Sequence, residues 1–200
     1  MSPTGQSRPQ GRPQLRVVEG GVASRGVPDP TDFDSLFRRF SPYVASIGLR
    51  LLGRDDEIDD LVQDVFLEAH RGLKSVRDAG AIKGWLARIC VRRAVRRLRR
   101  RRVRAFLSLE TLTHDAELVA PGASPEARAE VTQLYGKLER LAALERVVWV
   151  LRYLEGESLD DIAVLCACSK STVQRRLRTA DSALMLEQTA APLGATGDRS

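Results

Sequence analysis

Apolar residues recur every three or four positions in several separate stretches of the chain. One stretch covers Phe33–Leu51, a second covers Ile58–Ala69, and a third lies in a helix predicted from about Trp85 to Val103. Such spacing places apolar side chains on one face of a helix. Glycines between 72 and 84 predict a loop before the third helix. No segment shows the apolar–polar alternation of strands, so the pattern predicts an all-α fold.

The second half of the chain predicts a separate helical unit. Ser124 is a candidate N-cap, with Pro125 at the first helical position. The residues before it have weak periodicity and include a Pro-Gly pair, which is typical of a linker. We therefore expect two small helical domains joined by a flexible linker, the second containing a helix-turn-helix. The expected bounds are a disordered basic tail at 1–30, a first domain at 31–104, a linker at 105–124, a second domain at 125–187 and a disordered tail at 188–200.

The stretch Ser158–Asp181 predicts the helix-turn-helix. Ser158 and Asp161 form a capping box at the start of a first short helix. Ser169 can cap a second helix after a tight turn at 167–169. Many turns of this kind contain glycine, but position 167 is alanine, which tolerates a positive φ poorly. We therefore expect a slight departure from the usual turn geometry.

The second helix of this unit has an inward and an outward face. Val173 and Leu177 stand one turn apart and should face the core. The N-terminal half of such a helix normally enters the major groove of duplex DNA. The candidate contacts to base edges and phosphates are Lys170, Ser171, Thr172, Gln174, Arg175 and Arg178. An ordinary amphipathic helix pair with a solvated basic face is the alternative.

Charge favours a polyanionic partner. The 200 residues include 32 Lys and Arg against 26 Asp and Glu, which gives a net charge of +6. Arginines cluster in Arg88–Arg104 and suit contacts to phosphates. Trp85 could stack on an unpaired base or could anchor the core. The candidate DNA contacts of this helix are Trp85, Arg88, Arg92, Arg93, Arg96 and Arg97. A nonspecific basic patch is the alternative.

An acidic face on the helix near Ile58–Ala69 is a candidate protein-docking surface. Leu67 stands among charged residues there and could anchor a partner. The candidate contacts to a basic coiled coil are Asp60, Gln63, Asp64, Leu67 and Glu68. A solvated acidic face near a helix N-terminus is the alternative.

Other function classes find little support in the chain. The N-terminus has no apolar signal core, and no apolar run approaches the roughly 18 residues that a membrane helix needs. We therefore expect a cytoplasmic protein without membrane insertion. Cys166 and Cys168 have no nearby His or Cys to complete a metal site, so no metal or cofactor is expected. His70 and His114 lie far apart in sequence and no catalytic spacing is present, so we expect no enzyme.

Three stretches together resemble the extracytoplasmic-function (ECF) group of bacterial sigma factors. IDDLVQDVFLEAHR is similar to that family's polymerase-docking helix, and GWLARICVRRAVRRLRRRR to its helix for the promoter-melting element. RYLEGESLDDIAVLCACSKSTVQRRLRTADSAL is similar to its upstream-element-reading unit. Arg92 and Arg96 stand near positions where the family usually has Asn and Asp, which puts the usual readout of the melted element in doubt.

The resemblance implies a sigma factor that binds RNA polymerase core through the clamp coiled coil. It implies that the first domain helps melt the downstream promoter element and that the second reads the upstream element. It also implies that the polymerase supplies the chemistry and that an anti-sigma protein is a possible partner. A stand-alone helix-turn-helix regulator is the alternative, but it leaves the acidic helix and the arginine helix without a role.

Overall fold

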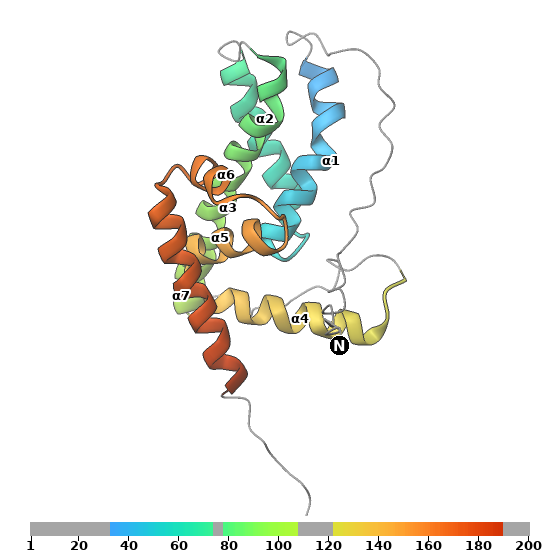
Figure 1. Ribbon diagram of the computed structural model, residues 1–200. Coiled ribbons are helices and arrows are strands. Elements are labelled where there is room, and N and C mark those ends of the chain that lie inside the picture. The colour runs from blue at the N-terminus through green and yellow to red at the C-terminus, as the bar shows by residue number, and fades with distance from the viewer. Residues whose placement is uncertain (1–32, 74–77, 108–121, 190–200) are drawn as a thin grey trace, which may run out of the picture.

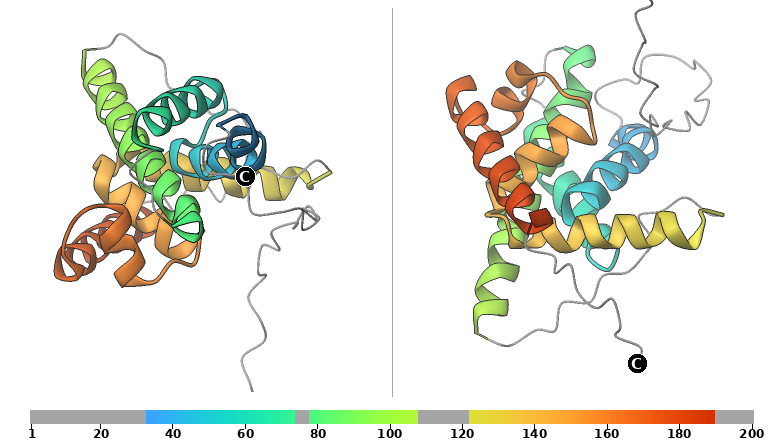
Figure 2. Two further views of the ribbon diagram at one scale, coloured as in Figure 1. Left: turned by 90° about the horizontal axis from the view of Figure 1, so that it is seen from above. Right: turned by 60° about the horizontal axis from the view of Figure 1, so that its bottom comes forward.

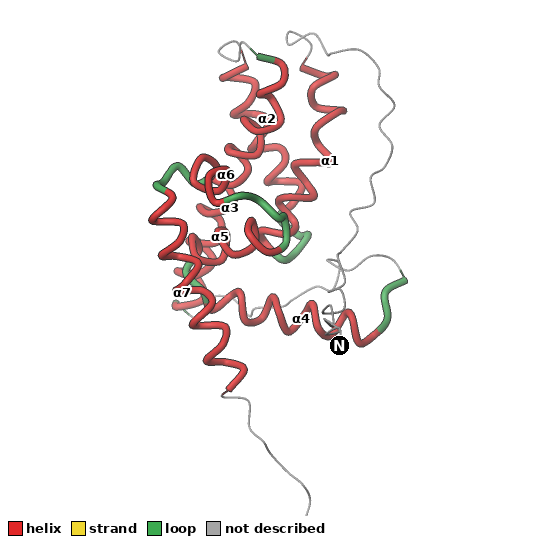
Figure 3. Tube along the Cα trace, in the orientation of Figure 1, coloured by secondary structure: helices red, strands yellow, loops and turns green. Residues whose placement is uncertain are grey.

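The computed structural model describes residues 33–73, 78–107 and 122–189 (Figure 1). Within these ranges the regular structure is helical and no strand occurs (Figure 3), which confirms the all-α prediction. The predicted tail at 1–30 and residues 108–121 of the predicted linker lie outside the described residues. The helices are α1 (Phe33–Leu52), α2 (Ile58–Gly72), η2 (Ala79–Ala81), α3 (Ile82–Phe106), α4 (Pro125–Arg140), α5 (Ala143–Tyr153), α6 (Leu159–Leu165) and α7 (Lys170–Thr189).

The helices α1, α2 and α3 pack on one another as a three-helix unit. The apolar stripes seen in the sequence form its core, and residues such as Val44, Leu61 and Leu86 are fully buried. The helix α1 continues through Pro42 even though proline removes one backbone donor. Burial of these stripes therefore accounts for the packing of α1, α2 and α3.

The start of α3 differs from the prediction. The helix begins at Ile82 rather than near Trp85 and continues to Phe106, beyond the predicted end of the first domain at 104. The Asp78 carboxylate accepts a hydrogen bond from the Gly80 amide (2.8 Å), and the Asp78 carbonyl accepts one from Ala81 (3.1 Å). These bonds nucleate η2, so that helical structure starts within the glycine-containing segment predicted as loop.

The helices α4 to α7 form the second unit, in which α5, α6 and α7 contact one another. The predicted cap of α4 is confirmed, because the Ser124 Oγ accepts a hydrogen bond from the Ala127 amide at 3.3 Å. The helix α7 extends to Thr189, two residues into the predicted C-terminal tail. Figure 2 shows α5–α7 against one side of α1–α3, and α3 contacts both α5 and α6. The two units therefore share one continuous apolar core.

Candidate nucleic-acid interface

Both helices of the helix-turn-helix begin with the predicted serine caps, but the Asp161 carboxylate bonds to the Ser158 hydroxyl rather than to the Ser158 amide that a capping box uses. The Ser158 Oγ accepts a hydrogen bond from the Asp161 amide (3.1 Å) and donates one to the Asp161 carboxylate (2.5 Å). The Ser169 Oγ accepts a hydrogen bond from the Thr172 amide at 3.3 Å. These side chains bind backbone donors that the first turns of α6 and α7 would otherwise leave free.

The turn between α6 and α7 has an unusual backbone at Ala167. Its φ is 50°, and it is the only non-glycine residue with a positive φ among the described residues. The Cys166 amide donates to the Ile162 carbonyl (2.8 Å), and the Cys168 amide donates to the Ala163 carbonyl (3.0 Å). The bonded turn therefore holds Ala167 in the left-handed region that glycine occupies at lower cost.

The helix α7 presents the predicted inward and outward faces. Val173 and Leu177 are buried, as expected. Five of the six candidate DNA contacts are exposed, namely Lys170, Ser171, Gln174, Arg175 and Arg178. The sixth, Thr172, is half-buried with its hydroxyl 2.9 Å from the Ser169 Oγ, and the Lys170 ammonium pairs with Asp160 at 2.8 Å. Arg175, Arg178 and Gln174 therefore form the outward donor set.

Sequence reasoning missed the residue that joins α7 to α5. The Asp181 carboxylate accepts hydrogen bonds from Trp149 Nε1 and from the Tyr153 hydroxyl, both at 3.2 Å. Its two partners lie 32 and 28 residues earlier in the chain, so no local sequence pattern indicates the contact. The contact fixes the direction in which α7 projects its donors.

The arginine face of α3 lies against the acidic face of α2. Arg92 and Arg93 both pair with Glu68, and the Arg93 distance is 2.7 Å. Arg97 pairs with Asp64 at 2.7 Å and approaches Glu57 at 3.7 Å. The two candidate sites that the sequence presented as separate surfaces therefore share an ionic network.

The network leaves part of each candidate surface open. On α2, Asp60 and Gln63 are exposed, and 52% of the Leu67 surface is accessible to solvent. On α3, Arg88 and Arg96 are exposed. Asp64 and Glu68 are half-buried beside their arginines. Leu67 is therefore an apolar candidate docking residue that takes no part in the ionic network.

The position of Trp85 is compatible with both roles that the sequence allowed, stacking on an unpaired base and anchoring the core. It is half-buried and packs against the core, and a Cβ added at Gly72 would lie 2.9 Å from its ring. The ring also lines an open groove together with Arg88. The tryptophan therefore anchors α3 against α2 and still presents an edge to solvent.

An apolar hollow next to Leu67 was not anticipated. It is lined by Phe33 and Phe37 of α1 and by Val62, Phe66 and Leu67 of α2. The Phe37 ring meets Phe66 edge to face with centroids 4.8 Å apart, and 40% of Phe37 is exposed. The sequence pattern assigned these α1 aromatics to the core stripe, because periodicity alone does not show where a stripe reaches the surface.

The ionic network lowers the pKa of Glu68, so its contribution to stability depends on pH. Burial raises the pKa of Glu68, but the Arg93 hydrogen bond and the charges of Arg92 and Arg93 outweigh burial, so its pKa lies below the usual 4.5. A carboxyl group whose pKa is lower in the folded state stabilises the fold at pH values above its pKa in the unfolded chain. That contribution is lost as the pH falls through the pKa of the folded state.

Replacing Glu68 with Gln is therefore expected to destabilise the protein at pH 7 by about 1 kcal/mol or less, since the pair is partly exposed. The deficit should shrink as pH falls below 4.5. Urea unfolding of both proteins at several pH values measures it, with Glu130→Gln on the exposed face of α4 as the control. A deficit that is independent of pH would contradict the ionic account.

The described residues contain no cluster of three or more His, Cys, Asp or Glu side chains able to hold a metal ion. Burial, with a smaller contribution from the neighbouring Cys168, raises the pKa of the Cys166 thiol to about 12, so Cys166 is a poor thiolate ligand. None of the helices in the described ranges combines the length and apolar character needed to cross a bilayer.

Comparison with known proteins matches two separate regions of the chain. The family description Sigma-70 region 2 matches residues 36–104, and Sigma-70, region 4 matches residues 132–180. The chain is 30% identical over 164 residues to the ECF RNA polymerase sigma factor SigM of Mycobacterium tuberculosis, covering 82% of this chain and 80% of that relative. It is 31% identical over 175 residues to the ECF RNA polymerase sigma-E factor of Haemophilus influenzae, covering 82% and 90%.

Two solved structures share the fold at 22% sequence identity. One is the sigma factor RpoE in complex with the anti-sigma factor NepR from Bartonella quintana, with a TM-score of 0.57 over 80% of this chain and 99% of that chain. The other is CnrH in complex with the cytosolic domain of CnrY, with a TM-score of 0.55 over 82% and 92%. On the strength of the two matched regions and these relatives, the chain belongs to the extracytoplasmic-function family of RNA polymerase sigma factors.

Proposed function

We propose that this sigma factor recognises the upstream promoter element with α7. The observation that carries the proposal is the outward donor set of Gln174, Arg175 and Arg178 on a helix whose inward residues are buried. The N-terminal half of α7 projects beyond the Ala167 turn, and this is the part of a recognition helix that meets base edges. Lys170 and Ser171 at the helix start suit phosphate contacts.

The α1–α3 unit supplies the other two contacts in this proposal. The exposed part of α2, with Leu67 as an apolar anchor between Asp60 and Gln63, binds the clamp coiled coil of the RNA polymerase core. The exposed arginines of α3 bind phosphates of the downstream element, and Trp85 borders that surface. The α2 network holds Arg92, Arg93 and Arg97 in place, so their contribution to DNA binding is partly neutralised.

The proposal assigns these roles to the domains predicted from the sequence. Residues 31–104 carry the polymerase and melting functions, residues 105–124 connect the units, and residues 125–187 read the upstream element. The sigma factor performs no catalysis of its own, because the polymerase makes the phosphodiester bonds. It acts in the cytoplasm, where polymerase and chromosome meet, and an anti-sigma protein is a candidate regulator.

Reconstituted transcription tests the function directly. The full chain is mixed with purified core polymerase and a library of promoter fragments, and run-off transcripts are sequenced. The expected result is a set of transcripts that starts downstream of a shared pair of elements and requires the chain. Tight DNA binding without any association with core would identify a stand-alone regulator instead.

Arg175→Ala is expected to weaken recognition of the upstream element by about 1–3 kcal/mol, or roughly 5- to 150-fold in affinity, because an arginine at a base edge makes a bidentate contact. Electrophoretic mobility shifts of holoenzyme on the selected promoter measure the loss. Arg128→Ala, an exposed arginine on α4, serves as the matched control. If both variants lose affinity equally, then Arg175 contributes only general charge.

A further inference from the structure

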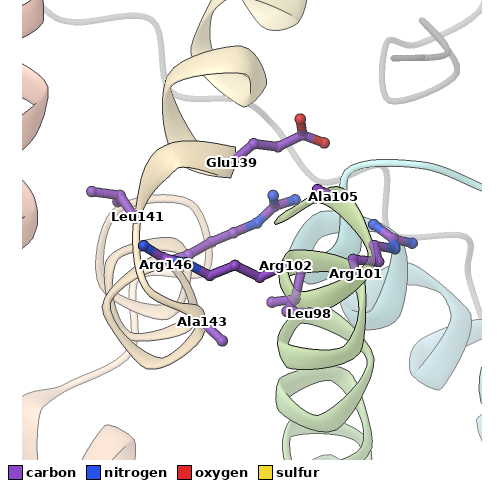
Figure 4. Close-up of a pocket in the computed structure, with 8 residues that line it drawn as sticks. All are labelled: Leu98, Arg101, Arg102, Ala105, Glu139, Leu141, Ala143 and Arg146. Carbon is purple, nitrogen blue, oxygen red and sulfur yellow. The ribbon is translucent and has the colours of Figure 1, made fainter. Parts of the chain in front are cut away.

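A small cavity lies between the last turns of α3 and the junction of α4 with α5. Its volume is about 90 Å³, so it has room for several water molecules or for one ion of similar bulk. Among the described residues, three arginines and one glutamate contribute charge to its lining, namely Arg101, Arg102, Arg146 and Glu139 (Figure 4). The lining therefore carries an excess of positive charge.

Two of the three arginines are buried and bind the same acceptor. Arg146 is 2% exposed and Arg101 is 5% exposed. The Leu52 carbonyl accepts hydrogen bonds from Arg146 Nη2 at 2.7 Å and from Arg101 Nη1 at 3.0 Å. Arg146 also donates from Nε to the neutral Leu51 carbonyl (3.1 Å), whereas Arg101 donates from Nε to the Glu57 carboxylate (2.8 Å). Two like charges are thus held close together, and only Arg101 has a carboxylate among these acceptors.

One donor of this pair lacks an acceptor. Arg101 Nη2 is buried and has no hydrogen-bond partner among the described residues. Such a donor is unfavourable, and a bound ion is one of the usual reasons why a folded protein keeps one. Burial lowers the pKa of Arg146 to about 10; the charges of Glu139 and Tyr135 oppose this decrease, and the charge of Arg101 adds to it. An anion in the cavity would stabilise both guanidinium groups.

The start of α5 adds backbone donors to the same place. The first amides of a helix have no acceptor within it, and the N-cap of α5 is Ala142, whose methyl side chain accepts no hydrogen bond. The Glu145 carboxylate accepts a hydrogen bond from the Ala142 amide at 3.2 Å. Leu141 and Ala143, on either side of the N-cap, both line the cavity. Helix starts with free amides bind phosphate and sulfate ions.

Arg102 is the exposed arginine of the lining. Figure 4 shows Arg102 reaching from α3 toward α5, while Arg146 reaches from α5 toward α3. The planar guanidinium group matches the oxygens of a phosphate and binds them in pairs. Because Arg102 is exposed, its donors are accessible to an ion that enters from solvent.

We propose that this cavity is a binding site for a phosphate group, which Arg102, the buried arginines and the start of α5 hold together. Three arginines and one glutamate give the lining a formal charge of +2, which matches the roughly −1.5 to −2 charge of a phosphate monoester at pH 7. The ligand is inorganic phosphate or the terminal phosphate of a nucleotide. None of the lining residues belongs to the DNA-binding or polymerase-binding surfaces proposed above.

Thermal unfolding of the full chain, followed by tryptophan fluorescence, tests the site. The protein is compared in a phosphate-free buffer and with inorganic phosphate, at one ionic strength set with sodium chloride. Phosphate at about 20 times its Kd should raise Tm by about 3 °C or more, because it binds only the folded chain. Isothermal titration calorimetry gives the Kd for the wild type and for each variant.

Two substitutions locate the bound phosphate. Arg102→Gln removes one donor and should weaken phosphate binding at least about tenfold, while Tm without phosphate stays unchanged or rises, since a like charge is gone. Ala105→Leu leaves every charge in place but fills part of the cavity, and it should abolish the phosphate-induced rise in Tm. Arg100→Gln is the matched control, because Arg100 is an exposed arginine of α3 outside the lining. A cooperative unfolding transition shows that each variant is folded.

Titration with ADP and with adenosine distinguishes the two sources of the phosphate group. Tighter binding of ADP than of inorganic phosphate, without binding of adenosine, would identify a nucleotide phosphate. Binding of inorganic phosphate that is equal to or tighter than that of ADP would identify the free ion. Both outcomes support the site, provided that Arg102→Gln weakens the binding.

Three results would overturn the proposal. The first is an unchanged Tm and no heat of binding with phosphate and ADP alike. The second is equal loss of phosphate binding in Arg102→Gln and Arg100→Gln, which would show attraction by the net charge of α3. The third is wild-type phosphate binding by folded Arg102→Gln or by folded Ala105→Leu, which would place the ion elsewhere on the protein.

Discussion

Replacing Leu67 with Asp is expected to weaken binding to RNA polymerase core by about 30-fold or more. Leu67 is an exposed leucine next to the apolar hollow of Phe33 and Phe37, and an apolar anchor at the centre of a contact is typically worth about 2 kcal/mol or more. A carboxylate there would lose the apolar contact and would be partly desolvated in the interface. Biolayer interferometry with immobilised core measures the affinity.

Val103→Asp provides the matched control for Leu67→Asp. Val103 is also an exposed apolar residue of the first unit, at 61% exposure, and it lies on α3 outside the proposed docking surface. Core affinity should stay near the wild-type value in that variant. Equal losses in the two variants would remove Leu67 from the interface. Asp64, another candidate docking residue, is a poorer choice for this test, because its loss would also remove the 2.7 Å ion pair with Arg97.

Replacing Ile162 with Ala is expected to destabilise the second unit by about 2–5 kcal/mol. Ile162 is fully buried in α6, which packs against α5 and α7, and the truncation leaves a cavity that so short a helix cannot close. Loss of this packing also releases the turn that positions α7. Urea unfolding measures the destabilisation, and promoter binding by holoenzyme should decline with it.

Val164→Ala gives the comparison on the same helix. Val164 is 54% exposed, so its truncation should change stability by no more than about 0.5 kcal/mol. If the two substitutions have equal effects, then α6 is not held by burial of Ile162. Unchanged promoter binding in a destabilised Ile162→Ala protein would show that α7 keeps its position without α6.

Local signals in the sequence were sufficient to predict the helix-turn-helix. The caps at Ser158 and Ser169 act within three residues, and Val173 and Leu177 lie one turn apart. The structure confirms each of these features, and it assigns to Ala167 the positive φ that made alanine unexpected there. The predicted start of α3 was too late, because the hydrogen bonds accepted by the Asp78 carboxylate and carbonyl outweighed the glycines of that segment.

Contacts between distant segments could not be inferred from the same signals. The pairing of Asp64 with Arg97 depends on how α2 and α3 cross, and Asp181 reaches Trp149 only after α7 has packed on α5. No local pattern distinguishes Arg146 from the other charged residues of the chain. Its burial against the Leu51 and Leu52 carbonyls follows from the docking of two units, which periodicity within one helix does not encode.

The sequence by itself therefore determined the all-helical class, the capped helix-turn-helix and the family resemblance, because caps and apolar spacing act within a few residues. Only the tertiary structure decided which charged residues remain available to partners. In the folded chain Asp64 and Glu68 form ion pairs with arginines, whereas Leu67 remains exposed. It also buried Arg146 at the end of α1, since the free energy of a buried charge depends on acceptors that only the folded chain supplies.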